Sequence, residues 1–64
     1  MTIFQGYHQV NSTLDVLMTQ GKLSFSNSEK KVALAFFTEV VNLFPGIPEA
    51  HEYRAQCLFI LVRI

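Results

Sequence analysis

Apolar residues recur at helical spacing along most of this 64-residue chain. In one segment Leu14, Leu17 and Met18 begin an apolar face at the i, i+3, i+4 spacing of an amphipathic helix. In a second segment, between Val32 and Phe44, adjacent apolar stripes repeat every four residues. A third apolar segment follows. The pattern therefore predicts an all-α fold. Its three helices are expected over residues 13–25, 29–44 and 48–63, approximately.

Local signals fix where these helices begin and end. Ser26 and Glu29 have the spacing of a capping box, which predicts the start of the second helix there. Pro45 cannot continue that helix, whereas Pro48 suits the first turn of the third. Residues 1–11 show no periodicity, so we expect an irregular N-terminal extension within a single domain of residues 1–64. Gly21 lies inside the first helix, where glycine lowers helix stability by about 1 kcal/mol relative to alanine. A glycine at such a position indicates that another backbone approaches closely.

The last segment is the least usual part of the pattern. Between Cys57 and Ile64 only Arg63 is polar, so this helix is apolar on every side. Such a helix is normally covered all round, and two other helices cannot enclose it completely. Ala50, Ala55 and Leu58 are its expected packing contacts within the chain. We therefore expect a surface of another molecule to cover the rest.

Charge and composition narrow the possible partners. Five basic and five acidic residues give a formal net charge of zero, which disfavours nucleic acid and anionic membranes as partners. The C-terminal apolar run is too short to span a bilayer, and the N-terminus has no signal-peptide pattern. We therefore expect an intracellular, cytoplasmic protein. The single cysteine, Cys57, excludes an intrachain disulfide and is expected to be a small buried apolar residue.

A weak internal repeat accompanies the helical pattern. At a separation of 34 residues Gly21 matches Ala55 and Phe25 matches Phe59. Within the second helix Ala33, Phe37, Val40 and Pro45 have the spacing of the second helix of a tetratricopeptide repeat (TPR). The segment PEAHEYRAQCL resembles the opening helix of the next repeat.

The chain thus resembles a TPR protein over residues 14–64, approximately. The first helix departs from the repeat pattern, with Leu17, Gln20 and Ser24 where tryptophan, leucine and tyrosine are usual. The resemblance implies a three-helix array made of one helix pair and the first helix of a second repeat. Because a repeat cannot bury its apolar face alone, a repeat without its second helix is expected to associate with another chain.

The resemblance also implies where a partner binds. TPR arrays bind extended peptides or helices on the concave surface of their first helices, which would hold Asp15 here. An apolar helix, an extended peptide or another protomer is the expected occupant of this groove. The lysine and asparagine set that binds chaperone tails is missing. The predicted partner-binding residues are Met18, Lys22, Phe25, Glu52, Gln56, Phe59, Ile60, Leu61 and Ile64.

We predict neither catalytic nor cofactor-binding residues, and we predict no metal site. The glycines do not form a phosphate loop, and His51 with Cys57 provides only two possible zinc ligands. Arg54 is expected to pair with Glu29 or Glu39, with a partner's carboxylate as the alternative. The expected function is that of an adaptor or scaffold for protein–protein interaction. The alternative is a small structural subunit of a larger complex without its own ligand, and an enzyme ranks last.

Overall fold

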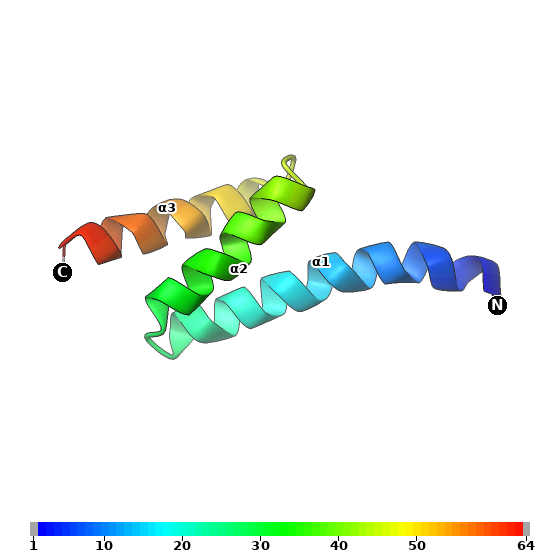
Figure 1. Ribbon diagram of the computed structural model, residues 1–64, viewed down its shortest axis with the longest axis horizontal. Helices are drawn as coiled ribbons and strands as arrows, with labels where there is room; N and C mark the ends of the chain where they lie inside the picture. The colour runs from blue at the N-terminus through cyan, green and yellow to red at the C-terminus, as the bar shows by residue number, and fades with distance from the viewer. Residues whose placement is uncertain (1, 64) are drawn as a thin grey trace.

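The computed structural model describes the backbone of residues 2–63 and the side chains of residues 13–63. Its helices are α1 (Thr2–Ser26), α2 (Lys30–Leu43) and α3 (Pro48–Arg63). The three helices form a zigzag in which α2 crosses between α1 and α3 (Figure 1). Residues 2–63 contain no strand, so the predicted three-helix, all-α fold is confirmed.

Helix α1 begins much earlier than the sequence pattern indicated. The structure is helical from Thr2, so the expectation of an irregular extension is wrong for residues 2–11. Met1 lies outside the described residues. Once a helix exists, each added residue contributes a hydrogen bond at low entropic cost, and residues 2–11 contain no proline to stop this growth. The first half of α1 extends beyond the other two helices (Figure 1).

The turn between α1 and α2 is built on the C-terminus of α1. The backbone N–H of Glu29 donates to the carbonyl oxygen of Ser24 at 2.9 Å, and that of Ser28 donates to Phe25 at 3.3 Å. Ser28 has a φ of 66°, in the left-handed region. These are the two bonds of a Schellman motif, in which Ser28 holds the position usually taken by glycine.

The predicted capping box is absent from this turn. Ser26 is still part of α1, and Glu29, the N-cap of α2, makes no side-chain capping hydrogen bond. The backbone N–H of Glu29 is already bonded to the carbonyl oxygen of Ser24, so it is not available to the hydroxyl of Ser26. The backbone hydrogen bonds of this turn are joined by one from a side chain, since Nζ of Lys30 donates to the carbonyl oxygen of Phe25.

Backbone and side-chain bonds also hold the turn between α2 and α3. The backbone N–H of Phe44 closes α2 by donating to the carbonyl oxygen of Val40 at 2.7 Å. Pro48 opens α3, where its missing N–H has no consequence. Nε2 of His51 lies 2.8 Å from the carbonyl oxygen of Pro45, so the first turn of α3 is tied to the loop before it.

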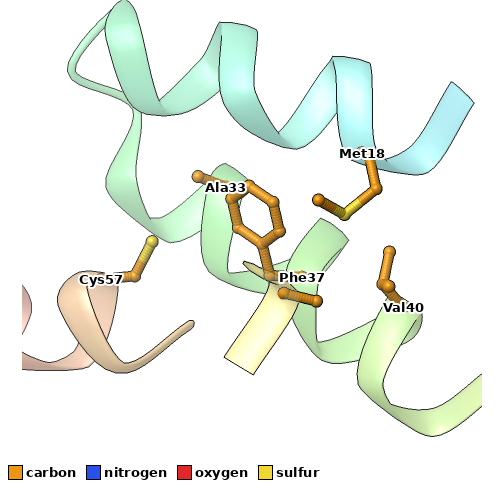
Figure 2. Close-up of a cluster of buried hydrophobic side chains, with 6 residues drawn as sticks. Met18, Ala33, Phe37, Val40 and Cys57 are labelled. Atoms are coloured by element: carbon orange, nitrogen blue, oxygen red, sulfur yellow. The ribbon is translucent and has the colours of Figure 1, made fainter. Parts of the chain in front are cut away.

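All three helices contribute to the core. In Figure 2 the ring of Phe37 points from α2 toward α1, Met18 reaches the same space from α1, and Cys57 reaches it from α3. Cys57 is fully buried, as its apolar surroundings in the sequence predicted. The fully buried and nearly buried apolar side chains are Met18, Ala33, Phe37, Val40, Ala50 and Cys57.

A close contact explains Gly21. A Cβ atom at this position would lie 2.7 Å from Cζ of Phe37, well inside van der Waals contact. The glycine was expected to face another backbone, and the structure corrects this to an aromatic ring. The helix thus loses some intrinsic stability at Gly21 and gains room for the largest buried side chain.

The ring of Phe37 continues into an aromatic joint, which we define as Gly21, Phe25, Phe37 and Tyr53. Phe37 stacks on Tyr53 with ring centroids 4.7 Å apart, and Phe25 meets Tyr53 edge-on at 5.3 Å. Pairs of this kind each contribute about 0.5–1.5 kcal/mol beyond their buried area. Tyr53 therefore connects α3 to both other helices.

The packing face of α3 differs from the predicted one. Ala50 and Cys57 are buried and Tyr53 is half-buried, at the i, i+3, i+7 spacing of one helix face. Ala50 was predicted correctly, whereas Ala55 and Leu58 are exposed and not packed against the core. Once Tyr53 sits in the aromatic joint, the helix period turns Ala55 and Leu58 outward.

Candidate functional site

The outward face of α3 carries a continuous row of apolar side chains. The row has the i, i+3, i+4, i+7 spacing of a single helix face. We call these residues the α3 stripe, and they are Ala55, Leu58, Phe59 and Val62. Phe59 is 61% exposed and Val62 is 83% exposed. Scattered exposed apolar residues are common, but a contiguous row is typical of an interaction surface.

A hollow and a projecting ring lie side by side in this stripe. The hollow has a volume of about 400 Å³ and is lined by Ala55, Gln56, Phe59 and Ile60. The small side chain of Ala55 leaves this space open beside the larger ring of Phe59. The guanidinium of Arg63 lies over that ring, 5.1 Å from its centroid, and so partly covers one side of it.

A second apolar hollow lies between α1 and α2. Its volume is about 530 Å³, and we call it the α1–α2 groove. It is lined by Leu17, Lys31, Val32, Ala35, Phe36 and Glu39. Val32 is 47% exposed at this groove. Because none of its lining residues comes from α3, the α1–α2 groove is a surface separate from the α3 stripe.

The predicted partner-binding residues of α1 take part in contacts within the chain. Met18 is only 8% exposed and belongs to the core. Nζ of Lys22 forms an ion pair with Oε2 of Glu49 at 3.0 Å, which joins α1 to α3. Phe25 belongs to the aromatic joint, and the ammonium group of Lys30 lies 4.1 Å from its ring centroid. The structure therefore does not bring these three α1 residues to the hollow beside Phe59.

The predicted residues of α3 are more closely grouped. Gln56, Phe59 and Ile60 share the hollow in the α3 stripe, and Glu52 is exposed one turn before it. Leu61 lies elsewhere, in a hollow of about 320 Å³ against the start of α2. Ile64 lies outside the described residues. The predicted set is thus split between a core contact, a helix junction and two surface hollows.

Arg54 has a partner that the sequence did not suggest. Its Nε donates a hydrogen bond to Oγ1 of Thr38 at 3.2 Å, between α3 and α2. Within the described part of the chain it pairs with neither Glu29 nor Glu39, so the expected ion pair is not formed. Glu39 instead lines the α1–α2 groove, away from α3. Arg54 therefore fixes the position of α3.

Among residues 13–63, whose side chains are described, one titratable group has a shifted pKa. Burial raises the pKa of the Cys57 thiol above its ordinary value, with a smaller opposing effect from the positive charge of Lys30. A thiol with a raised pKa stays protonated and is a poor nucleophile. Among the described residues no three histidine, cysteine or acidic side chains are grouped as metal ligands. In the same part of the chain, every helix is too short or too polar to cross a bilayer.

Sequence reasoning missed two features of this surface. It named Phe59 but not Leu58 or Val62 as partner-binding residues, although their spacing with Ala55 marks one helix face. It also gave no role to Tyr53, whose ring determines which side of α3 turns inward. The helix period alone could have identified the row but not its outward direction.

Comparison with known proteins adds no relative. The chain matches no family model and is significantly similar to no curated protein and no solved structure. The resemblance to TPR proteins accordingly stays a prediction.

Proposed function

We propose that this protein is a helical protein-binding module that docks a partner on the α3 stripe. The observation that carries the proposal is the exposure of Phe59 and Val62 next to a hollow on the same helix face. Burying a side chain of this size contributes about 1.5–3 kcal/mol, so the stripe has enough apolar surface to hold a helix or an extended peptide.

The fixed position of α3 supports the same proposal. The aromatic joint, the Arg54 to Thr38 hydrogen bond and the Lys22 to Glu49 ion pair tie its first half to both other helices. A surface that is already ordered loses less conformational entropy on binding than a mobile one. The second half of α3 thus presents the stripe on a rigid support.

A TPR-like architecture is part of this proposal. Ala33 is fully buried, and Phe37 packs against Gly21, which is how the small and aromatic positions of such a repeat are used. The preferred docking surface differs from the concave one that the resemblance implied. The reason is that Met18 and Phe25 have packing roles inside the chain.

The α1–α2 groove favours a second candidate function, that of a structural subunit within a larger assembly. A subunit of that kind has neighbours on two sides, and the groove provides a second apolar surface apart from α3. The two functions differ in one respect. A subunit needs both surfaces covered, whereas the binding module needs only the α3 stripe.

Site-specific photo-crosslinking in the cells that make the protein tests the proposal. A photoreactive residue at Val62 is expected to give a discrete adduct, with one at Val16 as the matched control. Val16 is also an exposed valine, at 55%, but it lies on α1. Equal adducts at both positions, or none at Val62, would contradict the proposal. An additional discrete adduct at Val32 would favour the structural subunit.

A further inference from the structure

The α3 stripe is complementary to itself in one particular orientation. The large ring of Phe59 and the small side chain of Ala55 lie one helical turn apart on the same face, and both line the hollow. When two copies of α3 run antiparallel, the register that puts Phe59 of one copy over Ala55 of the other necessarily makes the reciprocal contact as well. A parallel pair would instead set ring against ring and hollow against hollow.

The charges beside the stripe favour the same orientation. Glu52 and Arg63 are both exposed, and they lie along the same edge of the stripe. In the antiparallel register each Glu52 comes within about one residue rise, roughly 1.5 Å along the axis, of Arg63 of the other copy. In the described part of the chain, neither residue has an ion-pair partner. In a parallel pair this edge of one copy would lie on the opposite side of the interface from the same edge of the other copy, so the contact between Glu52 and Arg63 would not form.

The net charge of the chain is compatible with a second copy as the partner. The neutral net charge adds no repulsion between copies.

We propose that the α3 stripe is the interface of a symmetric homodimer with antiparallel α3 helices. In this dimer the Phe59 ring of each copy packs against Ala55 of the other copy, at the edge of the hollow. The inference rests on the proposed function, because it names the partner of the same stripe. An interface of one helix face is at the small end of the range, so dissociation is expected at roughly micromolar concentration.

Sedimentation equilibrium of the full chain from about 1 to 100 μM is the first measurement. The mass is expected to rise from that of a monomer to that of a dimer and then stay constant. A monomer at all concentrations would overturn the homodimer. A mass that keeps rising would overturn it too, since it indicates head-to-tail contacts of the stripe with the α1–α2 groove. Val32→Glu in that groove serves as the control and should leave dimerisation unchanged.

An exchange of the ring and the hollow tests the register. Phe59→Ala removes the ring and Ala55→Phe fills the hollow, so each single variant should weaken dimerisation at least about tenfold. The double variant rebuilds the same contact in reverse and should recover to within about threefold of the original affinity. All of these positions are exposed, and circular dichroism checks that the helices persist. A double variant as weak as the single ones would overturn the antiparallel register.

Charge reversal provides an independent test. Glu52→Arg and Arg63→Glu each create two repulsive contacts in a homodimer, whereas a mixture of the two variants forms a heterodimer with two attractive contacts. The heterodimer should associate several-fold more tightly than either variant alone. Equal association in all three samples would contradict the proposed edge contact.

The homodimer and the proposed function can fail separately. A monomer in the centrifuge, combined with a Val62 adduct to a different protein, would reject the homodimer and retain the binding module. A monomer without any Val62 adduct would reject both. A dimer disrupted by Phe59→Ala, with a Val62 adduct between two copies of this chain, would support both.

Discussion

The aromatic side chains in the two halves of α3 have opposite environments, with Tyr53 in the aromatic joint and Phe59 in solvent. In the first half Ala50 and Tyr53 are packed against α1 and α2, and the ring of Tyr53 stacks on Phe37. In the second half Phe59 and Val62 are in solvent, although they are equally apolar. The difference lies in the neighbours, because α2 offers its aromatic ring only to the first half. Residue type therefore does not tell which apolar side chains of α3 pack in the core and which are available to a partner. Their position relative to the aromatic joint does.

We expect the largest difference in the free energy of unfolding between the variants Phe37→Ala and Phe59→Ala. Phe37→Ala opens a cavity in the joint and should lower the free energy of unfolding by about 3–5 kcal/mol. That is as much as the whole core of so small a domain supplies, so this variant should be largely unfolded.

The matched control is Phe59→Ala, which should change the free energy of unfolding by less than about 0.5 kcal/mol. Urea titration followed by circular dichroism measures both. The protein is kept dilute, since dimerisation would add apparent stability. Similar losses in the two variants would mean that the stripe also supports the fold.

A pair of valines sharpens the same contrast. Val40 is fully buried, whereas Val62 is 83% exposed. Val40→Ala removes two buried methyl groups and should lower the free energy of unfolding by about 2 kcal/mol. Val62→Ala should leave it unchanged within about 0.5 kcal/mol. The same titration measures both, and a destabilised Val62→Ala would show that this side chain is covered in the monomer.

Addition of a methyl group tests how closely the joint is packed. Gly21→Ala gains about 1 kcal/mol of helix propensity but forces its Cβ to within 2.7 Å of Cζ of Phe37. The Phe37 ring is held by Tyr53 and cannot easily move away. Overpacking costs about 1–3 kcal/mol, so we expect a net loss of roughly 1 kcal/mol.

Gly46→Ala is the control for Gly21→Ala. A Cβ at Gly46 would meet no atom within 4 Å. Thermal unfolding of both variants measures the difference. A stabilised Gly21→Ala would show that the ring of Phe37 can shift and that the joint is loosely packed.

The smallest effect is expected from Cys57 at alkaline pH. Because burial raises the pKa of its thiol, the unfolded state loses the proton at a lower pH than the folded state. The free energy of unfolding should therefore fall as the pH rises from the ordinary value of 9.0 toward the raised one. Cys57→Ala should lack this component, and the difference between the two urea titrations across pH isolates it from other groups. An identical pH dependence would contradict burial of the thiol.

Local residue patterns predicted much of the fold. The helix of residues 30–43 follows from its repeated apolar stripes, and the turn before Pro48 follows from Pro45 and Gly46. The start of α1 could not be placed in this way, because no stop or start signal separates residues 2–11 from the rest of the helix. The Schellman motif could not be predicted either. Its left-handed position is usually recognised by a glycine, and here it is occupied by Ser28.

The candidate site was harder to predict than the fold. An apolar surplus at the end of the chain was evident, and Phe59 was named from it. Met18 was assigned to the partner-binding surface by the resemblance to TPR proteins, whereas its helical spacing fits a core residue equally well. Which face of an apolar helix is covered depends on its neighbours in space, and a single helix period does not contain that information.

The chain by itself determined three amphipathic helices, the break at Pro45 and an excess of apolar residues after Cys57, because these depend on local propensity and periodicity. Tertiary structure alone decided that Tyr53 turns inward and Phe59 outward, since the ring of Phe37 can accept only one face of α3. That choice is made by contacts between residues distant in the chain, and it leaves the α3 stripe exposed.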